Sequence, residues 1–428
     1  MLNITLDKAL DKNALLSTKA ENDFKLGICI MPSDRIRAIF NQNGYRFNRG
    51  IDYCVVVDKT CDRLAEITEA IAKLALSIKH NDTLSLVTYS DAPQIILDSL
   101  SSEDAVNKIK QIQVIQSDSK EANLHIGLKQ ARHIMASKGN ERLKKVLLIS
   151  GLRKNLNHNE EELLNSEIEN YKEFNISVDT LAIGDESNLF VLDNISNLLG
   201  GQGLLIDTLS DISAAARQSL ERCQKSILIN VKLKLKFNKY FRLKHIYRGT
   251  PTNAYLGKGT GKDEVVININ NMQIDKKQYY YFDLTSRIPK YGFEGSINLA
   301  QIGVEYSIPS SERKGDILER KSEMIAVKFT TNASKIQENR RLINMFSEAE
   351  IKRLESIMLD SKKKNEKEAV VYAYNQIINI YQEIGNIKLA RDYKASLEEF
   401  KESNIIVNKI ASESSKSSIN DNLPMLQL

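Results

Sequence analysis

Three oxygen-bearing side chains stand at alternating positions directly after an apolar stretch early in the chain. Asp58, Thr60 and Asp62 follow the segment 51–57, which has the composition of a buried strand. Side chains that follow a buried strand lie at the carboxyl edge of its sheet, where open α/β sheets bind their ligands. Carboxylate and hydroxyl oxygens are the ligands that hard divalent cations prefer. The series therefore predicts a binding site for a divalent cation or for an anionic group of a partner.

The elements that must position this series alternate between buried strands and amphipathic helices. The first strand, Tyr53 to Val57, is followed by apolar residues at three- and four-residue spacing from Leu64 to Ile78, which predicts a helix. Further strands are expected at 83–89, 94–97, 145–149, 177–183 and 203–207, and further helices at 102–112, 124–138, 161–174 and 189–198. This alternation predicts a doubly wound, mostly parallel sheet with helices on both faces.

Five segments, taken in order, resemble the von Willebrand factor type A domain. They are Val55–Asp62, Asp82–Ser90, Asn123–Leu128, Val146–Gly151 and Val178–Gly184. The resemblance implies the Rossmann-like α/β fold of that family for residues 49–222. Each segment alone is a weak signal, and the series of five over one continuous stretch carries the assignment.

Members of this family often carry a metal-ion-dependent adhesion site, built from an Asp-x-Ser-x-Ser loop, a Thr on a second loop and an Asp on a third. Here Asp58 matches the first Asp, and Thr60 replaces the first Ser with another hydroxyl. Asp62 stands where the second Ser belongs, Ala122 where the Thr belongs, and Ser150 where the third-loop Asp belongs. The resemblance thus implies a degenerate form of the adhesion site.

One interpretation of this degenerate site is a weak magnesium site. Magnesium takes oxygen ligands in near-octahedral geometry and can keep several waters, so an incomplete ligand set can hold it loosely. The residues with suitable oxygens are Asp58, Thr60, Asp62 and Ser150, and Ser119 or Glu121 would add another. Under this interpretation the only cofactor is Mg²⁺.

The alternative interpretation is a site without any cofactor. Thr60 or Asp62 then caps the helix that begins near Arg63, where a carboxylate also complements the helix dipole. Lys59 can act as a built-in cation at the same place, or it can be a solvated surface lysine.

The loops at the carboxyl ends of the strands form the expected partner-binding face, since rigid sheet-based domains use such loops for recognition. Arg153 and Lys154 give this face basic character, which suits an acidic partner segment, unless they lie in an ordinary solvated loop. The proposed face residues are Lys59, Arg63, Ser119, Glu121, Asn123, Arg153 and Lys154.

Residues 223–331 read as a β-sandwich. Residues 228–237 alternate apolar and polar side chains, as in a half-buried strand, and similar strands are expected at 240–247, 263–269, 278–285, 296–307 and 323–329. Strands are also expected at Phe24–Ile30 and Ile36–Phe40, within residues 23–48. We expect them to join the sandwich, so that the type A domain is inserted into it, and we expect residues 1–22 to be an N-terminal tail.

Residues 332–405 are expected to be helical. A first helix is predicted over 334–359, a charged break over 361–365, and then a helix pair around Gly385 that is similar to one tetratricopeptide unit. One such pair cannot bury its faces alone, so it must pack on the preceding helix, the sandwich or a partner. Residues 406–428 have the composition of a disordered tail, whose end, 423–428, is either a short docking peptide or a plain terminus.

Composition excludes several classes of function. The chain has 428 residues and a formal net charge of +5 from 60 basic and 55 acidic residues mixed along its length, so we expect no nucleic-acid binding. No signal peptide or membrane span is expected, which points to the cytoplasm. The four cysteines lack CxxC spacing, so a structural zinc site is not expected. Gly257–Lys262 lacks the spacing of a phosphate loop and is expected to be a hairpin turn between strands.

The layout as a whole resembles that of bacterial, particularly cyanobacterial, proteins with a type A domain, a β-domain and a helical C-terminal region. The resemblance implies a non-enzymatic scaffold that binds protein partners in a cytoplasmic assembly. Ring ATPases are among the partners that it implies. The alternative is Mg²⁺-dependent, adhesion-type ligand binding through the rearranged metal site. An enzyme is not expected, because the five histidines stand in no catalytic motif. The sequence leaves the oligomeric state open.

Overall fold

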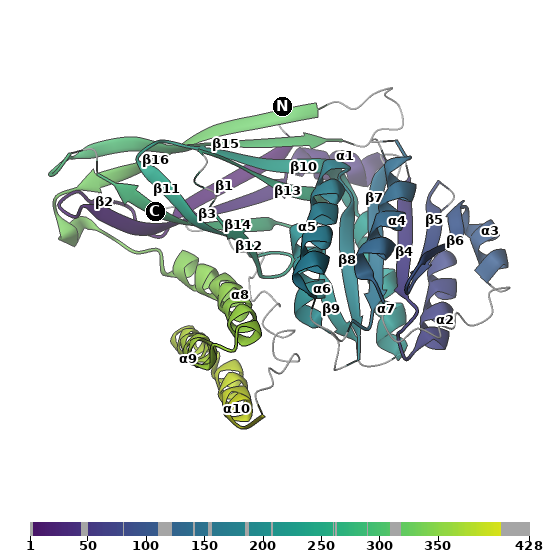
Figure 1. Cartoon of the computed structure of the whole chain (residues 1–428). Helices are drawn as coiled ribbons and strands as arrows, with labels where there is room; N and C mark the ends of the chain where they lie inside the picture. The colour runs from purple at the N-terminus through teal and green to yellow at the C-terminus, as the bar shows by residue number, and fades with distance from the viewer. Residues whose placement is uncertain are drawn as a thin grey trace.

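The computed structural model describes residues 3–43, 50–79, 81–109, 122–139, 142–152, 156–184, 188–206, 209–259, 261, 263–288, 290–308 and 318–403. These residues form one mostly parallel sheet with its helices, two further sheets packed as a sandwich, and a helical region at the C-terminal side (Figure 1).

The mostly parallel sheet has six strands in the order β6-β5-β4-β7-β8-β9. Their bounds are Ile51–Asp58 (β4), Thr83–Tyr89 (β5), Pro93–Leu100 (β6), Leu143–Ser150 (β7), Ser177–Ile183 (β8) and Gly203–Ile206 (β9). All neighbours pair in parallel except β6, which lies antiparallel at the edge beside β5. Every residue of the central strands β4 and β7 is buried, as expected of a sheet covered on both faces.

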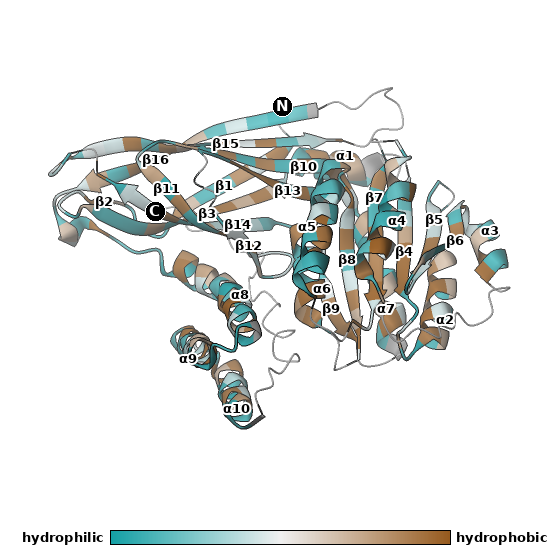
Figure 2. Cartoon of the chain, in the orientation of Figure 1, coloured by the Kyte–Doolittle hydropathy of each residue, from teal (hydrophilic) through white to brown (hydrophobic). Residues whose placement is uncertain are grey.

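Helices cover the two faces of this sheet in two groups. Helices α2 (Leu64–Ala75), α3 (Ser102–Ile109) and α7 (Leu209–Gln224) pack on one face, and α4 (Leu124–Ala136), α5 (His158–Glu173) and α6 (Leu189–Leu198) pack on the other. Strand β4 serves both layers, because Val55 and Val57 face the first group while Cys54 and Val56 face the second. Figure 2 shows hydrophobic residues along these central strands and a largely hydrophilic outer side on α5. Helix α7 was not predicted from the sequence.

The sandwich consists of two five-stranded sheets, β1-β3-β14-β11-β12 and β13-β10-β15-β16-β2. The bounds in the first sheet are Ile4–Leu10 (β1), Glu21–Pro32 (β3), Gln278–Arg287 (β14), Phe241–Arg248 (β11) and Ala254–Lys258 (β12). Those in the second are Glu264–Gln273 (β13), Ser226–Phe237 (β10), Gly295–Ser307 (β15), Leu318–Thr330 (β16) and Leu15–Leu16 (β2). Apolar side chains from both sheets fill one core between them.

In the sequence, the type A domain is inserted between β3 and β10, which belong to different sheets of the sandwich. This confirms the inserted arrangement. The expected N-terminal tail over 1–22 is wrong, because β1 pairs with β3 along its whole length. Its strand signal is masked by Asp7 and Lys8, and the Lys8 ammonium lies 2.6 Å from Glu323.

The strand expected at Ile36–Phe40 is also wrong. These residues lie in helix α1, Asp34–Asn43. Ile36 and Phe40 are four residues apart and so share one helical face, and both pack on the sandwich core. A short apolar run does not distinguish a strand from a helix by itself, and here the helical spacing was the better guide.

The C-terminal region, as far as it is described, has three helices, α8 (Arg340–Lys363), α9 (Lys367–Glu383) and α10 (Ile387–Ser403). The first begins later than predicted, because the Asn339 side chain caps it by accepting a hydrogen bond of 3.1 Å from the Leu342 amide. Its apolar face covers the outer side of the first sandwich sheet, where Phe346 meets Tyr247 edge to face at 5.0 Å between centroids. Helices α8, α9 and α10 share a further core, which confirms that the helix pair packs on the preceding helix. The predicted tail, 406–428, lies outside the described residues.

Candidate functional site

The candidate site starts at the carboxyl end of β4. Asp58 is the last residue of this strand and is fully buried. Its neighbours at the same edge are Tyr89, which ends β5, and Ser150, which ends β7. The Lys59 amide donates a hydrogen bond of 2.9 Å to the Tyr89 carbonyl, and the Cys61 amide donates one of 3.3 Å back to the Asp58 carbonyl, so the chain turns directly after Asp58.

Both carboxylate oxygens of Asp58 accept hydrogen bonds from the protein. Oδ1 accepts from the Thr60 amide at 2.8 Å and from the Thr60 hydroxyl at 2.6 Å. Oδ2 accepts from the Ser150 hydroxyl at 2.8 Å, and Ser150 Oγ itself accepts from the Tyr89 hydroxyl at 3.2 Å and from the Leu152 amide at 3.1 Å. We call Asp58, Thr60, Tyr89 and Ser150 the Asp58 cluster. A buried carboxylate needs such donors, and this one obtains them from Thr60 in its own loop and from Ser150 at the end of β7.

Tyr89 was not identified from the sequence as part of the site. Burial raises the pKa of Tyr89 well above its usual value, the Asp58 charge raises it further, and the hydrogen bond to Ser150 lowers it slightly. The phenol therefore stays protonated at neutral pH and acts as a donor. A glycine on α4 makes room for its ring, since a Cβ on Gly127 would lie 2.6 Å from the Tyr89 Cδ1 atom. The position of Tyr89 at the end of the second strand was the available signal.

The described residues fit a metal ion poorly at this edge. Ala122 is buried and brings only a methyl group, and Ser150 turns its hydroxyl to Asp58. Asp62 lies exposed in the turn before α2. Within the described ranges no group of three or more His, Cys, Asp or Glu side chains is placed to hold a metal. Ser119 and Glu121, which the sequence suggested as additional ligands, lie outside these ranges.

The capping interpretation also needs correction where it concerns Thr60. The N-cap residue of α2 is Arg63, and it makes no capping hydrogen bond with its side chain. The Thr60 hydroxyl is engaged by Asp58 instead of by the helix amides. Thr60 therefore holds the Asp58 carboxylate, and the capping role expected of Asp62 stays a prediction.

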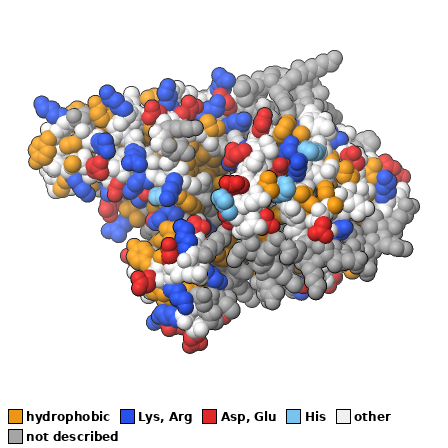
Figure 3. All heavy atoms as spheres, in the orientation of Figure 1, with side chains coloured by type: hydrophobic (Ala, Val, Ile, Leu, Met, Phe, Trp, Pro, Cys, Tyr) orange, Lys and Arg blue, Asp and Glu red, His pale blue; other side chains and the backbone are white. Residues whose placement is uncertain are grey.

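Three of the seven proposed face residues are described, and they lie at one edge of the sheet. Lys59 and Arg63 follow β4 and are half-buried. Asn123 is exposed at the N-cap of α4, and its amide donates a hydrogen bond of 3.0 Å to the Ser90 carbonyl, just after β5. Ser119, Glu121, Arg153 and Lys154 lie outside the described residues. On the side shown in Figure 3, acidic and basic side chains are interspersed.

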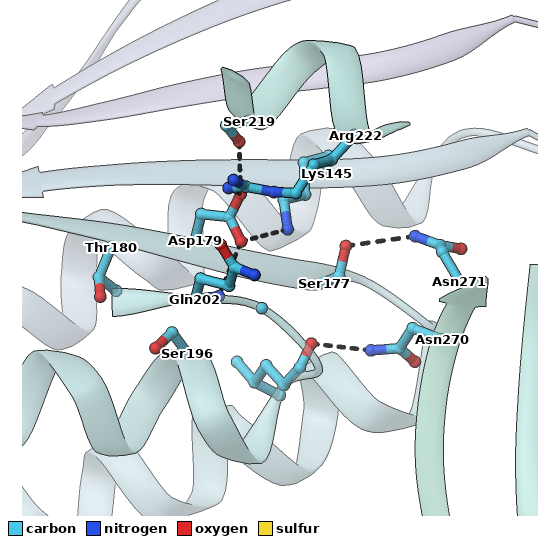
Figure 4. A network of polar contacts seen from close by, with 12 residues as sticks. Lys145, Ser177, Asp179, Thr180, Ser196, Gln202, Ser219, Arg222, Asn270 and Asn271 are labelled. Atoms are coloured by element: carbon cyan, nitrogen blue, oxygen red, sulfur yellow. Dashed lines mark hydrogen bonds and ion pairs between the residues drawn. The ribbon is translucent and has the colours of Figure 1, made fainter. Parts of the chain in front are cut away.

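A second polar centre, absent from the sequence predictions, lies near the amino-terminal half of β7 and β8 (Figure 4). Asp179 is buried and pairs with Lys145 at 2.6 Å and Arg222 at 2.7 Å. It also accepts from the Ser219 hydroxyl at 2.5 Å and the Gln202 amide at 2.9 Å. Burial alone would raise the pKa of Asp179, but the two cations and these hydrogen bonds lower it below its usual value. The centre ties α7 to the sheet.

Arg248 joins the sandwich to the type A domain beside this centre. Its guanidinium is buried and donates to the Asn197 side chain at 2.6 Å, to the Gly201 carbonyl at 3.1 Å and to the Thr252 hydroxyl at 2.9 Å. Asn270 adds a bond of 2.8 Å to the Leu199 carbonyl. The α6–β9 loop is thus held by strands of the sandwich.

The sheet order, the two helical layers and the position of Asp58 define a von Willebrand factor type A fold, as the sequence motifs predicted. Among solved structures, a von Willebrand factor type A protein from Catenulispora acidiphila is similar, with a TM-score of 0.69 and 13% identity over 90% of this chain and 89% of that one. The ArnB paralog VWA2 from Sulfolobus acidocaldarius gives a TM-score of 0.58 and 14% identity over 98% and 100%. Human COPII-coat protein Sec24c gives 0.51 and 12% identity over 86% of this chain and 54% of that one.

These likenesses concern the fold. The first two extend well beyond residues 49–222. No protein-family model matches the sequence, and no curated protein matches it significantly. None of the helices in the described part of the chain is both long enough and apolar enough to span a membrane.

Proposed function

We propose that this chain is a non-enzymatic protein-interaction module that binds protein partners at the carboxyl edge of its type A sheet, without a metal ion. The observation that carries the proposal is the Asp58 cluster. Its carboxylate is already satisfied by the Thr60 and Ser150 hydroxyls, so the edge is ordered by hydrogen bonds within the protein. A rigid edge of this kind presents a preformed surface, which reduces the ordering cost of binding.

The proposed contact surface consists of the loops around Asp58. Lys59, Arg63 and Asn123 belong to it, and Ser119, Glu121, Arg153 and Lys154 complete it by sequence. Four of these seven side chains are basic, one is acidic and two are neutral, so an acidic segment of a protein is the favoured partner. An assembly partner in the cytoplasm, such as a ring ATPase, is the first class to test. The helical region is proposed as a second contact surface.

Partner capture tests the surface directly. The immobilised chain is exposed to extract from the native host, with and without a chelator, and retained proteins are identified by mass spectrometry. We expect the same partner in both conditions and its loss from Lys59→Glu. Lys129→Glu is the matched control, because Lys129 is exposed on α4 away from this edge. Retention by Lys59→Glu equal to that of the wild type would contradict the proposed surface.

Metal-dependent adhesion through the rearranged site is the competing function. It is supported by the buried Asp58 carboxylate at the position that the adhesion site requires. Calorimetric titration with Mg²⁺ distinguishes the two. We expect no saturable heat at millimolar Mg²⁺, whereas tight binding that disappears in Asp58→Asn, together with chelator-sensitive capture, would establish the adhesion mechanism instead.

A further inference from the structure

A cavity of about 480 Å³ lies between the sandwich and the type A domain. Strands β10 to β14 contribute to its wall from both sandwich sheets, and helices α5 and α6 contribute from the type A domain. Pockets of about 300–1,000 Å³ at domain interfaces, with apolar walls and a few polar groups, are common ligand sites. The apolar side chains in the wall are Leu198, Ile246, Leu256, Val266 and Ile267.

Two polar side chains line this cavity from neighbouring strands of the first sandwich sheet. Arg248 on β11 pairs directly with Tyr280 on β14, and directly paired residues project their side chains from the same face of a sheet. Tyr280 belongs to the core between the two sheets, so this is the inner face. Both residues are only 2% exposed. A guanidinium and a phenol therefore lie side by side in a buried place that has room for a ligand.

The Arg248 guanidinium has hydrogen bonds but no counter-ion. Its acceptors are uncharged oxygens of Asn197, Gly201 and Thr252. Among the described residues no carboxylate lies within ion-pair distance of it. Burial lowers the pKa of Arg248, against the opposing effects of more distant groups. A buried charge without a partner is costly, and an anion that comes close to it reduces this cost.

The Tyr280 hydroxyl has no hydrogen-bond partner among the described residues. Burial raises the pKa of Tyr280 to about 12, and the Arg248 charge alone opposes this rise, with no contribution from a hydrogen bond. The hydroxyls of Tyr279 and Tyr281, on the other face of the sheet, are sealed from solvent, whereas that of Tyr280 keeps accessible surface at the cavity. The protonated phenol is thus a donor that lacks an acceptor.

The more exposed lining residues add positive charge. Lys232 on β10 is half-buried and forms no ion pair with any residue that the structure describes. Lys172 is neutralised by Glu169 at 2.6 Å, and Glu173 is exposed. With Arg248, the lining residues comprise three cations and two carboxylates, a formal charge of +1. Positive charge beside apolar walls suits an anion carried on an apolar body.

We propose that this cavity binds an organic anion, a carboxylate carried on an apolar chain. The carboxylate accepts a hydrogen bond from the Tyr280 hydroxyl beside the Arg248 charge. The chain lies against Leu198 of α6 and against Ile246 and Ile267, one from each sandwich sheet. A phosphate fits less well, because it brings more charge and more acceptor oxygens than these few donors satisfy.

The site is separate from the Asp58 edge and does not depend on the function proposed there. A bound carboxylate would contact α6 together with both sandwich sheets, and so would stiffen the junction between the two domains.

Calorimetry on the full chain with octanoate, at neutral pH and low ionic strength, tests this site. We expect saturable binding that is at least about tenfold weaker in Tyr280→Phe, since a hydrogen bond to a charged group contributes at least that factor. Tyr279→Phe is the matched control, because Tyr279 is equally buried on the same strand and faces the opposite side of the sheet. Lys232→Gln should weaken binding about two- to fivefold. Lys236→Gln should not, because Lys236 is exposed on the same strand and does not line the cavity.

Four outcomes would overturn the proposal. The first is the absence of saturable octanoate binding, and the second is equal weakening by Tyr280→Phe and Tyr279→Phe. The third is binding of neutral 1-octanol as tight as that of octanoate, which would show apolar adsorption without recognition of the anion. The fourth is equally tight binding of inorganic phosphate, which would remove the role of the apolar walls. Thermal denaturation shows whether Tyr280→Phe is folded, and the two lysine variants decide the question if it is not.

Discussion

Replacing Asp179 by asparagine should destabilise the type A domain strongly. The carboxylate pairs with Lys145 and Arg222 in a place where the Lys145 and Asp179 side chains are only 6% and 2% exposed. An asparagine keeps the shape but leaves both cations without a counter-charge. Breaking a buried ion pair in this way costs about 3–5 kcal/mol. We therefore expect local opening of β7, β8 and α7 to become easier by about that free energy.

Hydrogen exchange followed by mass spectrometry measures this opening segment by segment. The double variant Lys145→Met with Asp179→Asn should recover part of the loss, because it removes a buried cation together with its partner. Asp98→Asn, on the edge strand β6 and exposed, is the control and should change little. A decrease of less than about 1 kcal/mol in the free energy of opening in Asp179→Asn would refute the reasoning, because removing one partner of a buried ion pair leaves an uncompensated buried charge.

The same side chain predicts a dependence on pH. The pKa of Asp179 is lower in the folded protein than its usual value, so its contribution to stability is present above the usual value of an aspartate and is lost as pH falls below it. As the pH is lowered through this range, the free energy of unfolding of the type A domain should therefore fall less in Asp179→Asn than in the wild type. Identical acid profiles for the two proteins would contradict this.

Two further predictions concern packing. Arg248→Met should increase hydrogen exchange in the α6–β9 loop and lower the free energy of unfolding by about 2–3 kcal/mol, because the Asn197 and Gly201 oxygens lose their donor. Unchanged exchange in this loop would contradict the role of Arg248 between domains. Gly127→Ala should lower the thermal midpoint and cost about 1–3 kcal/mol by overpacking against the Tyr89 ring, and a wild-type midpoint would show that the ring moves freely.

The type A fold was predictable because its central strands contain short apolar runs and alternate with segments of helical spacing. The segment Val55–Val57 and the helical spacing after Leu64 leave little choice of architecture. The N-terminal strand β1 was missed because Asp7 and Lys8 interrupt its alternation, and they are tolerated since Lys8 pairs with Glu323. Helix α1 was taken for a strand because Ile36–Phe40 is short and apolar.

The candidate site was predictable only in part. Asp58 and Thr60 were identified from their positions at the end of a strand and Ser150 from the resemblance to the adhesion site, and the structure brings them together. Tyr89 was missed because a tyrosine that ends a buried strand looks like a core residue. Asp179 and Arg222 lie 43 positions apart in the sequence, and no local pattern could show that they meet. Long-range polar pairing of this kind follows from topology and not from periodicity.

The insertion between β3 and β10 has a mechanical consequence. Helix α7 ends at Gln224 and β10 starts at Ser226, so one connection is a nearly continuous run from the type A domain into the second sandwich sheet. The other connection leaves from β3 in the first sheet. A force applied to the type A domain is therefore divided between two covalent paths, one into each sheet. Twisting the type A domain would load both sheets at once, and we therefore expect the two connections together to resist its rotation.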